Sequence, residues 1–294
     1  MTVTYRIEHR MCFRYAAPAE DSVMTLYVCP LRDRVQLVRE FFVETQPDGT
    51  LFEFTDPFGN TGHFLERPRV RDELRVVARS TVELGPLGRA PERLDSEAWT
   101  RLGRTAHNVA FWPMLHPSHF VTPTPTLEKF LETHGIAPGD DPLVSTRELC
   151  ATLYNVLEYS PGETTVDSPI DRVLETGRGV CQDYAHVMAA VLRGWGIPCR
   201  YVSGYLGTAA AGLAEGESHA WVEAWFPGSG WIGFDPTNDT EGDERHIRVA
   251  VGRDYADVPP TRGTFRGAAG SVLDTEVVIE RIEDADSPDQ DLST

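Results

Sequence analysis

The hydrophobic periodicity of the chain changes along its length, and this change constrains the fold more than any other feature. Residues 3–15 alternate between apolar and polar side chains, which is typical of a half-buried strand. Residues 184–195 repeat their apolar side chains at the spacing of a core-facing helix. Residues 219–235 alternate again. Strands, then helices, then strands predict an α+β fold.

Three parts are expected along the chain. Residues 1–100 are expected to form an N-terminal β-rich, sandwich-like domain, because turn sequences such as "PDG" and "DPFGN" separate its strand patterns. Residues 118–250 place helix patterns before strand patterns and form the second unit. In residues 251–294, "SVLDTEVVIERI" predicts a strand that returns to the N-terminal sheet, and the acidic end "EDADSPDQDLST" is expected to be disordered.

The composition argues against several classes of function. Forty-five acidic and 27 basic residues give a net charge of −18, which disfavours binding to nucleic acid or to anionic membranes. No apolar run approaches the roughly 20 residues that cross a bilayer, and the N-terminus lacks the apolar stretch of a signal peptide. The five cysteines form no CxxC pair and there is no EF-hand loop, so we expect a cytosolic protein without metal or cofactor. The sequence leaves the oligomeric state open.

One cysteine stands at the start of the helix pattern, in "GRGVCQDYAHVMAAVLRGWGIP". Gly177 and Gly179 precede Cys181, and Gly196 and Pro198 end the helix. A thiol in the first helical turn feels the positive end of the helix dipole, which stabilises a thiolate, and the free N–H groups there can receive an oxyanion. On the helix alone the alternative stays open that Cys181 is a small buried apolar residue, the commonest fate of a free cysteine.

Two further residues complete the order of a nucleophile, a base and an orienting acid. "ESHAWVEAWFPGSGWIGFDPTND" predicts two strands around the turn "PGSG", with His219 on the first and Asp235 on the second. A four-residue loop would place these two side chains on opposite faces. A three-residue loop at 227–229 sets Asp235 opposite Trp221 and diagonal to His219, within side-chain reach. We therefore predict a three-residue loop or a bulge.

The blocks "GRGVCQDYAHVMAAVLRGWGIPCRYVSGYL", "SHAWVEAWF" and "GWIGFDPTN" resemble the three motif blocks of the transglutaminase-like superfamily, in its bacterial and archaeal branch of papain-like thiol enzymes. The strands with "DPFGN" resemble the bacterial transglutaminase-like N-terminal region, and "HIRVAVGRDYADVPPTRGTFRG" resembles the segment that follows the core. The resemblance implies helices packed on an antiparallel sheet. It also implies Cys181 as nucleophile, His219 as base and Asp235 as orienting acid.

The resemblance implies a cysteine enzyme that cleaves or transfers amide acyl groups of a peptide or protein through a Cys181 thioester. Peptidase or amidase action and protein-glutamine acyl transfer both fit, and we favour hydrolysis slightly because no amine site is identified. The Cys181 N–H would be one oxyanion donor, and Tyr159 is a candidate for the second. Trp221 and Trp231 share parities with His219 and Asp235 and could line an acyl-donor channel, although ordinary packing explains them as well.

Two alternatives remain open at this point. In the first, the triad is retained but silent, and the β-rich domain recognises a peptide or protein partner. In the second, Cys181, His219 and Asp235 together bind zinc.

Overall fold

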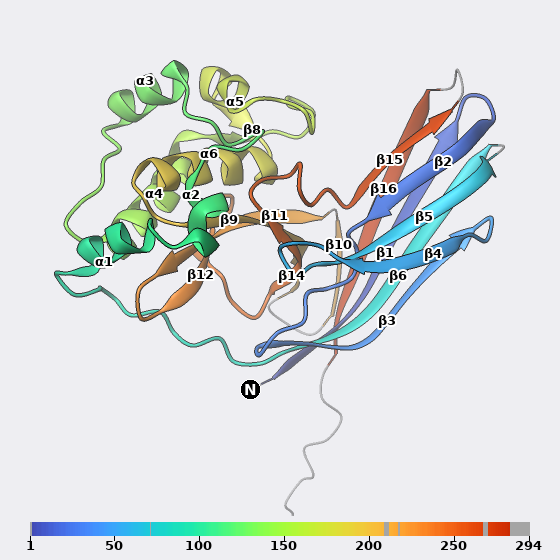
Figure 1. Ribbon diagram of the computed structural model, residues 1–294, viewed down its shortest axis with the longest axis horizontal. Helices are drawn as coiled ribbons and strands as arrows, with labels where there is room; N and C mark the ends of the chain where they lie inside the picture. Colours follow the sequence, from blue (N-terminus) through green and yellow to red (C-terminus); the bar gives the residue numbers. More distant parts are fainter. Residues whose placement is uncertain (1, 71, 209–211, 217, 267–269, 283–294) are drawn as a thin grey trace, which may run out of the picture.

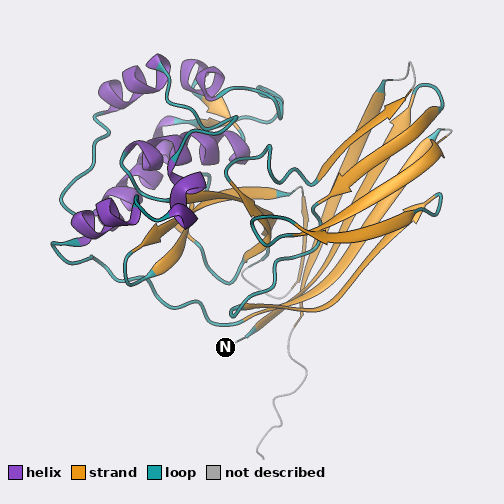
Figure 2. Ribbon diagram, viewed as in Figure 1, coloured by secondary structure: helices purple, strands orange, loops and turns teal. Residues whose placement is uncertain are grey.

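The computed structural model describes residues 2–70, 72–208, 212–216, 218–266 and 270–282. Figures 1 and 2 show an α+β molecule, in which all helices gather on one side and two all-β sheets stand on the other. The expectation of a disordered acidic end falls on 283–294, outside the described residues. The helices are α1 (Ala98–Thr105), the short 3₁₀ turn η1 (Val109–Phe111), α2 (Trp112–Leu115), α3 (Pro125–His134), α4 (Pro142–Val156), α5 (Ile170–Thr176) and α6 (Cys181–Gly194).

Two of the helices begin at a capping side chain that is followed by proline. The Thr124 hydroxyl accepts the Leu127 N–H at the start of α3. One carboxylate oxygen of Asp141 accepts the N–H groups of Leu143 and Val144 at the start of α4. Such caps satisfy backbone donors that have no acceptor within the helix, and proline lacks the donor altogether.

Two sheets of mainly N-terminal strands share one apolar core. One sheet has the strand order β10-β16-β1-β6-β3 and the other the order β15-β2-β5-β4. Met11 and Val76 from the first sheet and Leu26 from the second lie in one buried cluster, and burial alternates along β1 as predicted. The strands are β1 (Val3–Tyr15), β2 (Ala19–Leu26), β3 (Gln36–Gln46), β4 (Thr50–Thr55), β5 (Thr61–Val70), β6 (Glu73–Leu84), β10 (Gly212–Gly216), β15 (Thr261–Arg266) and β16 (Ser271–Ile282).

The C-terminal part of the chain completes these two sheets. β16 pairs antiparallel with β1 from Thr4↔Ile282 to Tyr15↔Ser271, which confirms the predicted returning strand. β15 pairs with β2, and β10 pairs with β16. The sequence patterns did not indicate the pairings of β15 and β10. The sheets therefore depend on strands from both ends of the sequence.

The third sheet carries the helices. Its order is β13-β12-β11-β9-β14, and every pairing in it is antiparallel. Helix α6 lies across β9 and β11 (Figure 1), where its buried stripe shares one apolar cluster with Ala220, Val222 and Ala224. The strands are β9 (Cys199–Leu206), β11 (His219–Phe226), β12 (Gly230–Asp235), β13 (Thr240–Glu241) and β14 (His246–Gly252), with a separate parallel pair β7 (Glu158–Tyr159) and β8 (Arg178–Gly179) before α6.

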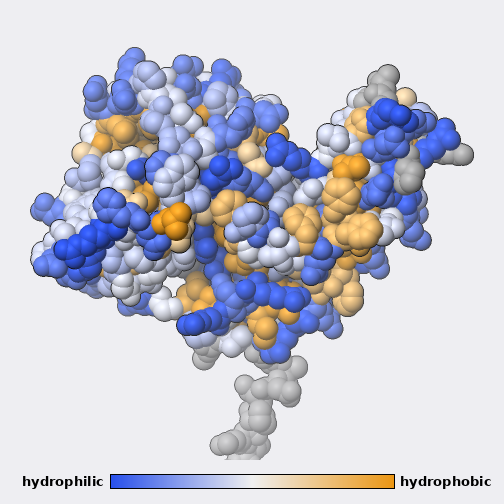
Figure 3. Space-filling model, viewed as in Figure 1, coloured by the Kyte–Doolittle hydropathy of each residue, from blue (hydrophilic) through white to orange (hydrophobic). Residues whose placement is uncertain are grey.

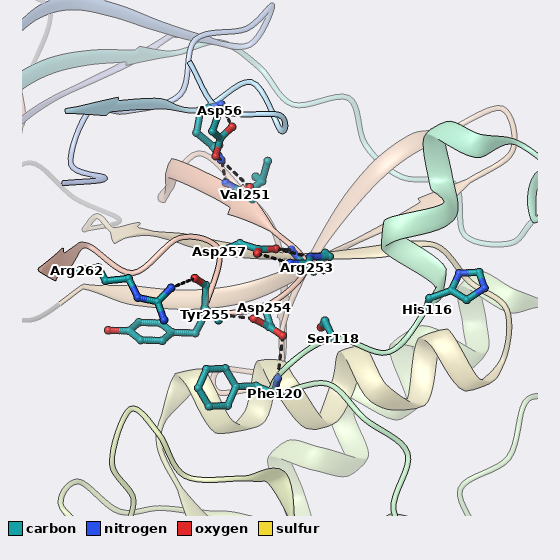
Figure 4. Close-up of polar contacts among 12 residues, drawn as sticks. Asp56, His116, Ser118, Phe120, Val251, Arg253, Asp254, Tyr255, Asp257 and Arg262 are labelled. Carbon is teal, nitrogen blue, oxygen red and sulfur yellow. Dashed lines mark hydrogen bonds and ion pairs between the residues drawn. The ribbon is translucent and has the colours of Figure 1, made fainter. Parts of the chain in front are cut away.

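The N-terminal strands and the helix-covered sheet are joined at the edge strand β14. The buried amide of Gln36 accepts the Arg248 N–H at 2.9 Å and donates to the Arg248 carbonyl at 2.7 Å. The buried amide of Asn60 makes the same two bonds to Val251, beside the turn that holds Asp56 (Figure 4). Each amide thus satisfies a donor and an acceptor that a neighbouring strand would otherwise bind.

The outer face of the sheet β15-β2-β5-β4 is partly apolar. Figure 3 shows apolar side chains gathered over this part of the molecule, on an otherwise largely hydrophilic face. Phe52 of β4 is 54% exposed and lies directly opposite the half-buried Phe64 of β5. Contiguous exposed apolar patches, rather than single exposed apolar residues, mark protein-binding surfaces.

Candidate active site

Cys181 is the first residue of α6, where the sequence analysis placed it. Val180 is the extended N-cap residue, and its N–H donates to Oδ2 of Asp183 at 2.8 Å. The thiol of Cys181 is partly exposed, whereas the side chains of Cys29, Cys150 and Cys199 are buried. Because Cys181 lies in the first turn, its N–H has no acceptor within the helix. This position gives the thiol access to solvent and a backbone donor beside it.

The residues around Cys181 fix the start of the helix. A Cβ atom on Gly179 would lie 2.8 Å from Oδ2 of Asp183, so only glycine leaves room for the capping carboxylate. The Asp183 carboxylate also accepts the Thr164 hydroxyl at 2.6 Å, and Gln182 Nε2 donates to the Val166 carbonyl at 3.0 Å. Asp183 thus acts as the N-terminal helix charge that its position predicts, and it binds loop 160–169 to the first turn.

The hairpin of β11 and β12 brings His219 and Asp235 together. Phe226 pairs with Gly230, so the loop has three residues, 227–229, and the predicted register is confirmed. Nε2 of His219 lies 2.7 Å from Oδ2 of Asp235. Asp235 is fully buried, and Thr237 and Asn238 donate further hydrogen bonds to its carboxylate. These donors hold the carboxylate plane toward the imidazole.

The imidazole of His219 links the carboxylate to the thiol. Since Nε2 bonds to Asp235, the hydrogen bond between His219 and Cys181 leaves Nδ1 for the thiol. Burial lowers the pKa of His219, but the hydrogen bonds with Asp235 and Cys181 outweigh it and raise the pKa to about 10. Burial raises the pKa of Asp235, yet the hydrogen bonds from its histidine partners hold it well below its usual range. At neutral pH the pair is therefore imidazolium and carboxylate.

This arrangement does not suit the zinc alternative. In the part of the chain that the structure describes, no group of three or more His, Cys, Asp or Glu side chains is arranged to hold a metal ion. Three ligands of one metal ion converge on a single point about 2.0–2.3 Å from every donor atom. His219 and Asp235 instead bond directly to each other at 2.7 Å.

A second histidine, which the sequence analysis missed, contacts the same carboxylate. Nε2 of His246 lies 3.4 Å from Oδ2 of Asp235, and its Nδ1 lies 2.9 Å from Oδ1 of Asp243. Burial lowers the pKa of His246, and its hydrogen bonds to the two carboxylates raise it above its ordinary value. No spacing rule links His246 to Asp235, because the contact depends on where β14 begins relative to the end of β12.

The predicted channel role of Trp221 is corrected by the structure. Its side chain is only 1% exposed, and it packs with Leu31 and Phe58 of the N-terminal part. Its ring lies 6.2 Å from that of His219 and 5.2 Å, edge-on, from that of His246. The alternation of side chains along β11 predicted the correct face for Trp221, but Leu31 and Phe58 cover that face. Trp221 supports the two histidine rings from the core instead of lining a channel.

Trp231 and Tyr159, the other two predicted substrate-binding residues, lie on β12 and β7. Trp231 is four residues from Asp235 on β12, or about 13 Å along the strand. The Arg200 guanidinium covers its ring at 4.4 Å, and a channel-lining role of Trp231 stays a prediction. Tyr159 pairs with Gly179 through the β7–β8 ladder, and its side chain is 52% exposed. A role of Tyr159 as the second oxyanion donor stays a prediction.

The segment after β14 binds the helix that carries Cys181. The Tyr255 N–H donates to Nε2 of the buried His186 at 3.2 Å, and burial lowers the pKa of His186 to about 3, so the ring stays a neutral acceptor. Asp254 accepts the Phe120 N–H at 2.9 Å. His186 therefore has a structural role, and it lies about 140° around the helix from Cys181.

The fold and the site define a class of protein. A partly exposed cysteine at a helix N-terminus faces a histidine and an aspartate on an antiparallel sheet, which is the arrangement of papain-like thiol enzymes. The chain belongs to the transglutaminase-like superfamily. Residues 132–236 match the family described as Transglutaminase-like superfamily, and residues 5–83 match the Bacterial transglutaminase-like N-terminal region.

Three relatives illustrate the extent of the similarity. An uncharacterized protein of Mycobacterium leprae is 35% identical over 94% of this chain and 98% of its own length. A protein-glutamine gamma-glutamyltransferase of Pseudomonas aeruginosa is 38% identical over 118 residues, which are 36% of this chain and 18% of that protein. A crystal structure of a candidate cysteine protease from Cytophaga hutchinsonii has a TM-score of 0.76 at 20% identity, over 98% of this chain and 93% of its own. The last likeness shows the fold alone, and it includes the N-terminal sheets.

Proposed function

We propose that this chain is a cysteine enzyme that attacks amide carbonyl groups of peptides or proteins with Cys181. The observation that carries the proposal is the hydrogen-bonded series from the thiol through His219 to the buried Asp235. A histidine that is held by a buried carboxylate beside a thiol is placed to exchange a proton with it, and the thiolate is the nucleophilic form of a cysteine.

The first half-reaction forms a thioester. The Cys181 thiolate adds to the carbonyl carbon, and the resulting oxyanion lies at the α6 N-terminus, where the Cys181 N–H can donate to it. The intermediate collapses with cleavage of the C–N bond. His219 gives its Nδ1 proton to the leaving nitrogen, and Asp235 keeps the ring oriented throughout.

The second half-reaction releases the acyl group. Water or a primary amine adds to the thioester carbonyl, and its proton passes to His219. The C–S bond then breaks, and Cys181 leaves as a thiolate beside the re-formed imidazolium. When water is the acceptor the product is a carboxylic acid, and when an amine is the acceptor the product is a new amide. We place hydrolysis first, because water is always present and amine transfer needs a site that orients the amine.

One incubation separates these reactions. The protein is mixed with casein and with or without monodansylcadaverine, and dansyl incorporation, ammonia release and new N-termini are measured. Dansyl incorporation identifies acyl transfer, ammonia without cleavage identifies glutamine hydrolysis, and new N-termini identify a peptidase. Each activity should vanish in Cys181→Ala and persist in Cys12→Ala, a matched control at the other partly exposed cysteine, on β1.

A second candidate function is that of a binding module with a silent triad. The exposed Phe52, paired with Phe64 on the outer face of β4 and β5, favours this alternative. It would replace the first proposal if Cys181 proved unreactive in the native protein. Among the described residues, none of the helices has the length and apolar character to cross a membrane, and a cytosolic location stays a prediction.

A further inference from the structure

We propose that His246 is a positioning residue of this site, which holds Asp235 in place and acts on Cys181 only through Asp235 and His219. The inference rests on the proposed function and deepens it. His246 is buried at the start of β14 and lies between two carboxylates, 3.4 Å from Asp235 Oδ2 and 2.9 Å from Asp243 Oδ1. His246 thereby adds a fourth residue to the hydrogen-bonded series of Cys181, His219 and Asp235 that the sequence predicted.

The orientation of the His246 ring follows from its neighbours. The backbone N–H of Asp243 points at Nδ1 from 3.1 Å, in addition to the carboxylate of the same residue. If the ring is neutral, Nδ1 accepts this N–H and the proton resides on Nε2. If the ring is charged, both nitrogens carry protons and Nδ1 donates to the Asp243 carboxylate. In both states Nε2 carries a proton that points at Asp235. An unprotonated Nε2 would place its lone pair against those of the carboxylate, which is repulsive.

The neighbours of His246 also prevent the ring from turning away. Arg245 donates its backbone N–H and its Nε to the Asp243 carboxylate, at 2.9 Å and 2.8 Å, and thereby fixes the acceptor beside Nδ1. The ring of Trp221 packs edge-on against His246 from β11 at 5.2 Å. The charged and titratable groups that face His246 are thus Asp235 from β12 and Asp243 with Arg245 from the loop before β14.

The consequence for the site concerns a single oxygen atom. Oδ2 of Asp235 is the shared hydrogen-bond acceptor of His219, His246 and Asn238. Without His246, a buried carboxylate would lose one donor and one of the contacts that fix its plane. His219 would then lose the geometry of its own bond to Oδ2, and with it the orientation of Nδ1 toward the thiol.

The test compares His246→Leu, which removes the donor, with His246→Gln, whose side-chain amide can still donate to Asp235. Phe226→Leu is a matched control, because Phe226 is a fully buried residue at the far end of β11 and its truncation weakens the core without contacting Asp235. Two quantities are measured in each folded variant. They are the rate of Cys181 alkylation by iodoacetamide at pH 6 and the exchange of the His219 Nε2–H resonance in ¹H–¹⁵N spectra.

We expect His246→Leu to slow alkylation about tenfold or more, the loss typical of residues that orient functional ligands, and to broaden the His219 Nε2–H signal by exchange with water. His246→Gln should preserve the signal and recover most of the rate, and Phe226→Leu should change neither. The inference is overturned if His246→Leu behaves like Phe226→Leu, or if His246→Gln is as impaired as His246→Leu. The spectra need no substrate and no reactive thiol, so they decide the role of His246 even if the proposed function fails.

Discussion

The side chain of Asn60 binds both backbone groups of Val251, as a neighbouring strand would. Its Oδ1 accepts the Val251 N–H at 2.8 Å and its Nδ2 donates to the Val251 carbonyl at 2.8 Å. Nδ2 also donates to the Asp56 carboxylate at 2.7 Å, so the turn "DPFGN" holds the amide in place. The edge of the sheet that carries His219 is therefore closed by the N-terminal part of the chain.

Replacement of this amide should destabilise the whole molecule. Asn60→Ala leaves the N–H and carbonyl of Val251 buried without partners, which should lower the free energy of unfolding by about 2 to 4 kcal/mol. Urea unfolding followed by circular dichroism measures the loss. Asn155→Ala is the control, because Asn155 is exposed on α4 and its loss should change stability by no more than about 0.5 kcal/mol. Equal losses in the two variants would show that the amide bridge is energetically unimportant.

The ionisation of His219 should depend on Asp235. Wild-type His219 is expected to stay protonated at pH 7 and to titrate near pH 10, because the hydrogen bonds with Asp235 and Cys181 outweigh burial. Asp235→Asn removes the carboxylate and should move the titration toward the ordinary histidine value. Histidine ¹⁵N spectra over pH 5–10.5 measure this shift, with Asp140→Asn as an exposed carboxylate control. If His219 titrated near pH 6.5 both in the wild type and in Asp235→Asn, the hydrogen bond with Asp235 would not control its ionisation.

The same ionisation predicts how stability varies with pH. The pKa of His219 is raised from 6.5 to about 10 in the folded protein. Its contribution to stability is thus fully present below about pH 6.5 and is lost as the pH rises toward 10. The difference in unfolding free energy between wild type and His219→Gln should be largest at pH 6, smaller at pH 8 and smallest at pH 10. A difference that is constant or grows with pH would have the wrong sign.

A glycine on β9 should be essential for the packing behind the two histidines. A Cβ atom on Gly204 would lie 2.3 Å from the Ile247 carbonyl oxygen and 2.5 Å from the Trp221 ring. Gly204→Ala should therefore cost about 3 kcal/mol and, by displacing Trp221, slow the alkylation of Cys181. Gly194→Ala is the matched control, because its Cβ meets open space at the end of α6 and should stabilise the helix slightly. A Gly204→Ala protein as stable as Gly194→Ala would contradict the close packing.

Local patterns in the sequence were sufficient for much of the site. The helix start at Cys181 follows from glycine signals and helical periodicity, and the pairing of His219 with Asp235 follows from strand parity and a three-residue loop. Each of these inferences uses residues that are close in sequence, where backbone geometry fixes the relation between side chains.

The failures concern contacts between distant segments. Parity placed Trp221 on the correct face of β11 but could not show that Leu31 and Phe58 cover that face. The contact of His246 with Asp235 depends on where β14 begins relative to β12, which no local pattern specifies. The pairing of β15 with β2 likewise joins segments more than 200 residues apart.

The most direct test of an activated Cys181 is the rate at which iodoacetamide alkylates this residue at pH 6, with the labelled site located by mass spectrometry. An ordinary cysteine with a pKa near 8.5 is less than about 1% thiolate at this pH. We predict that Cys181 in the native protein reacts at least about tenfold faster than in urea-unfolded protein and that His219→Ala removes this advantage. The buried Cys29, Cys150 and Cys199 should stay unlabelled in the native state. Native Cys181 that reacts no faster than the unfolded chain, or equally fast without His219, would contradict an activated cysteine–histidine pair.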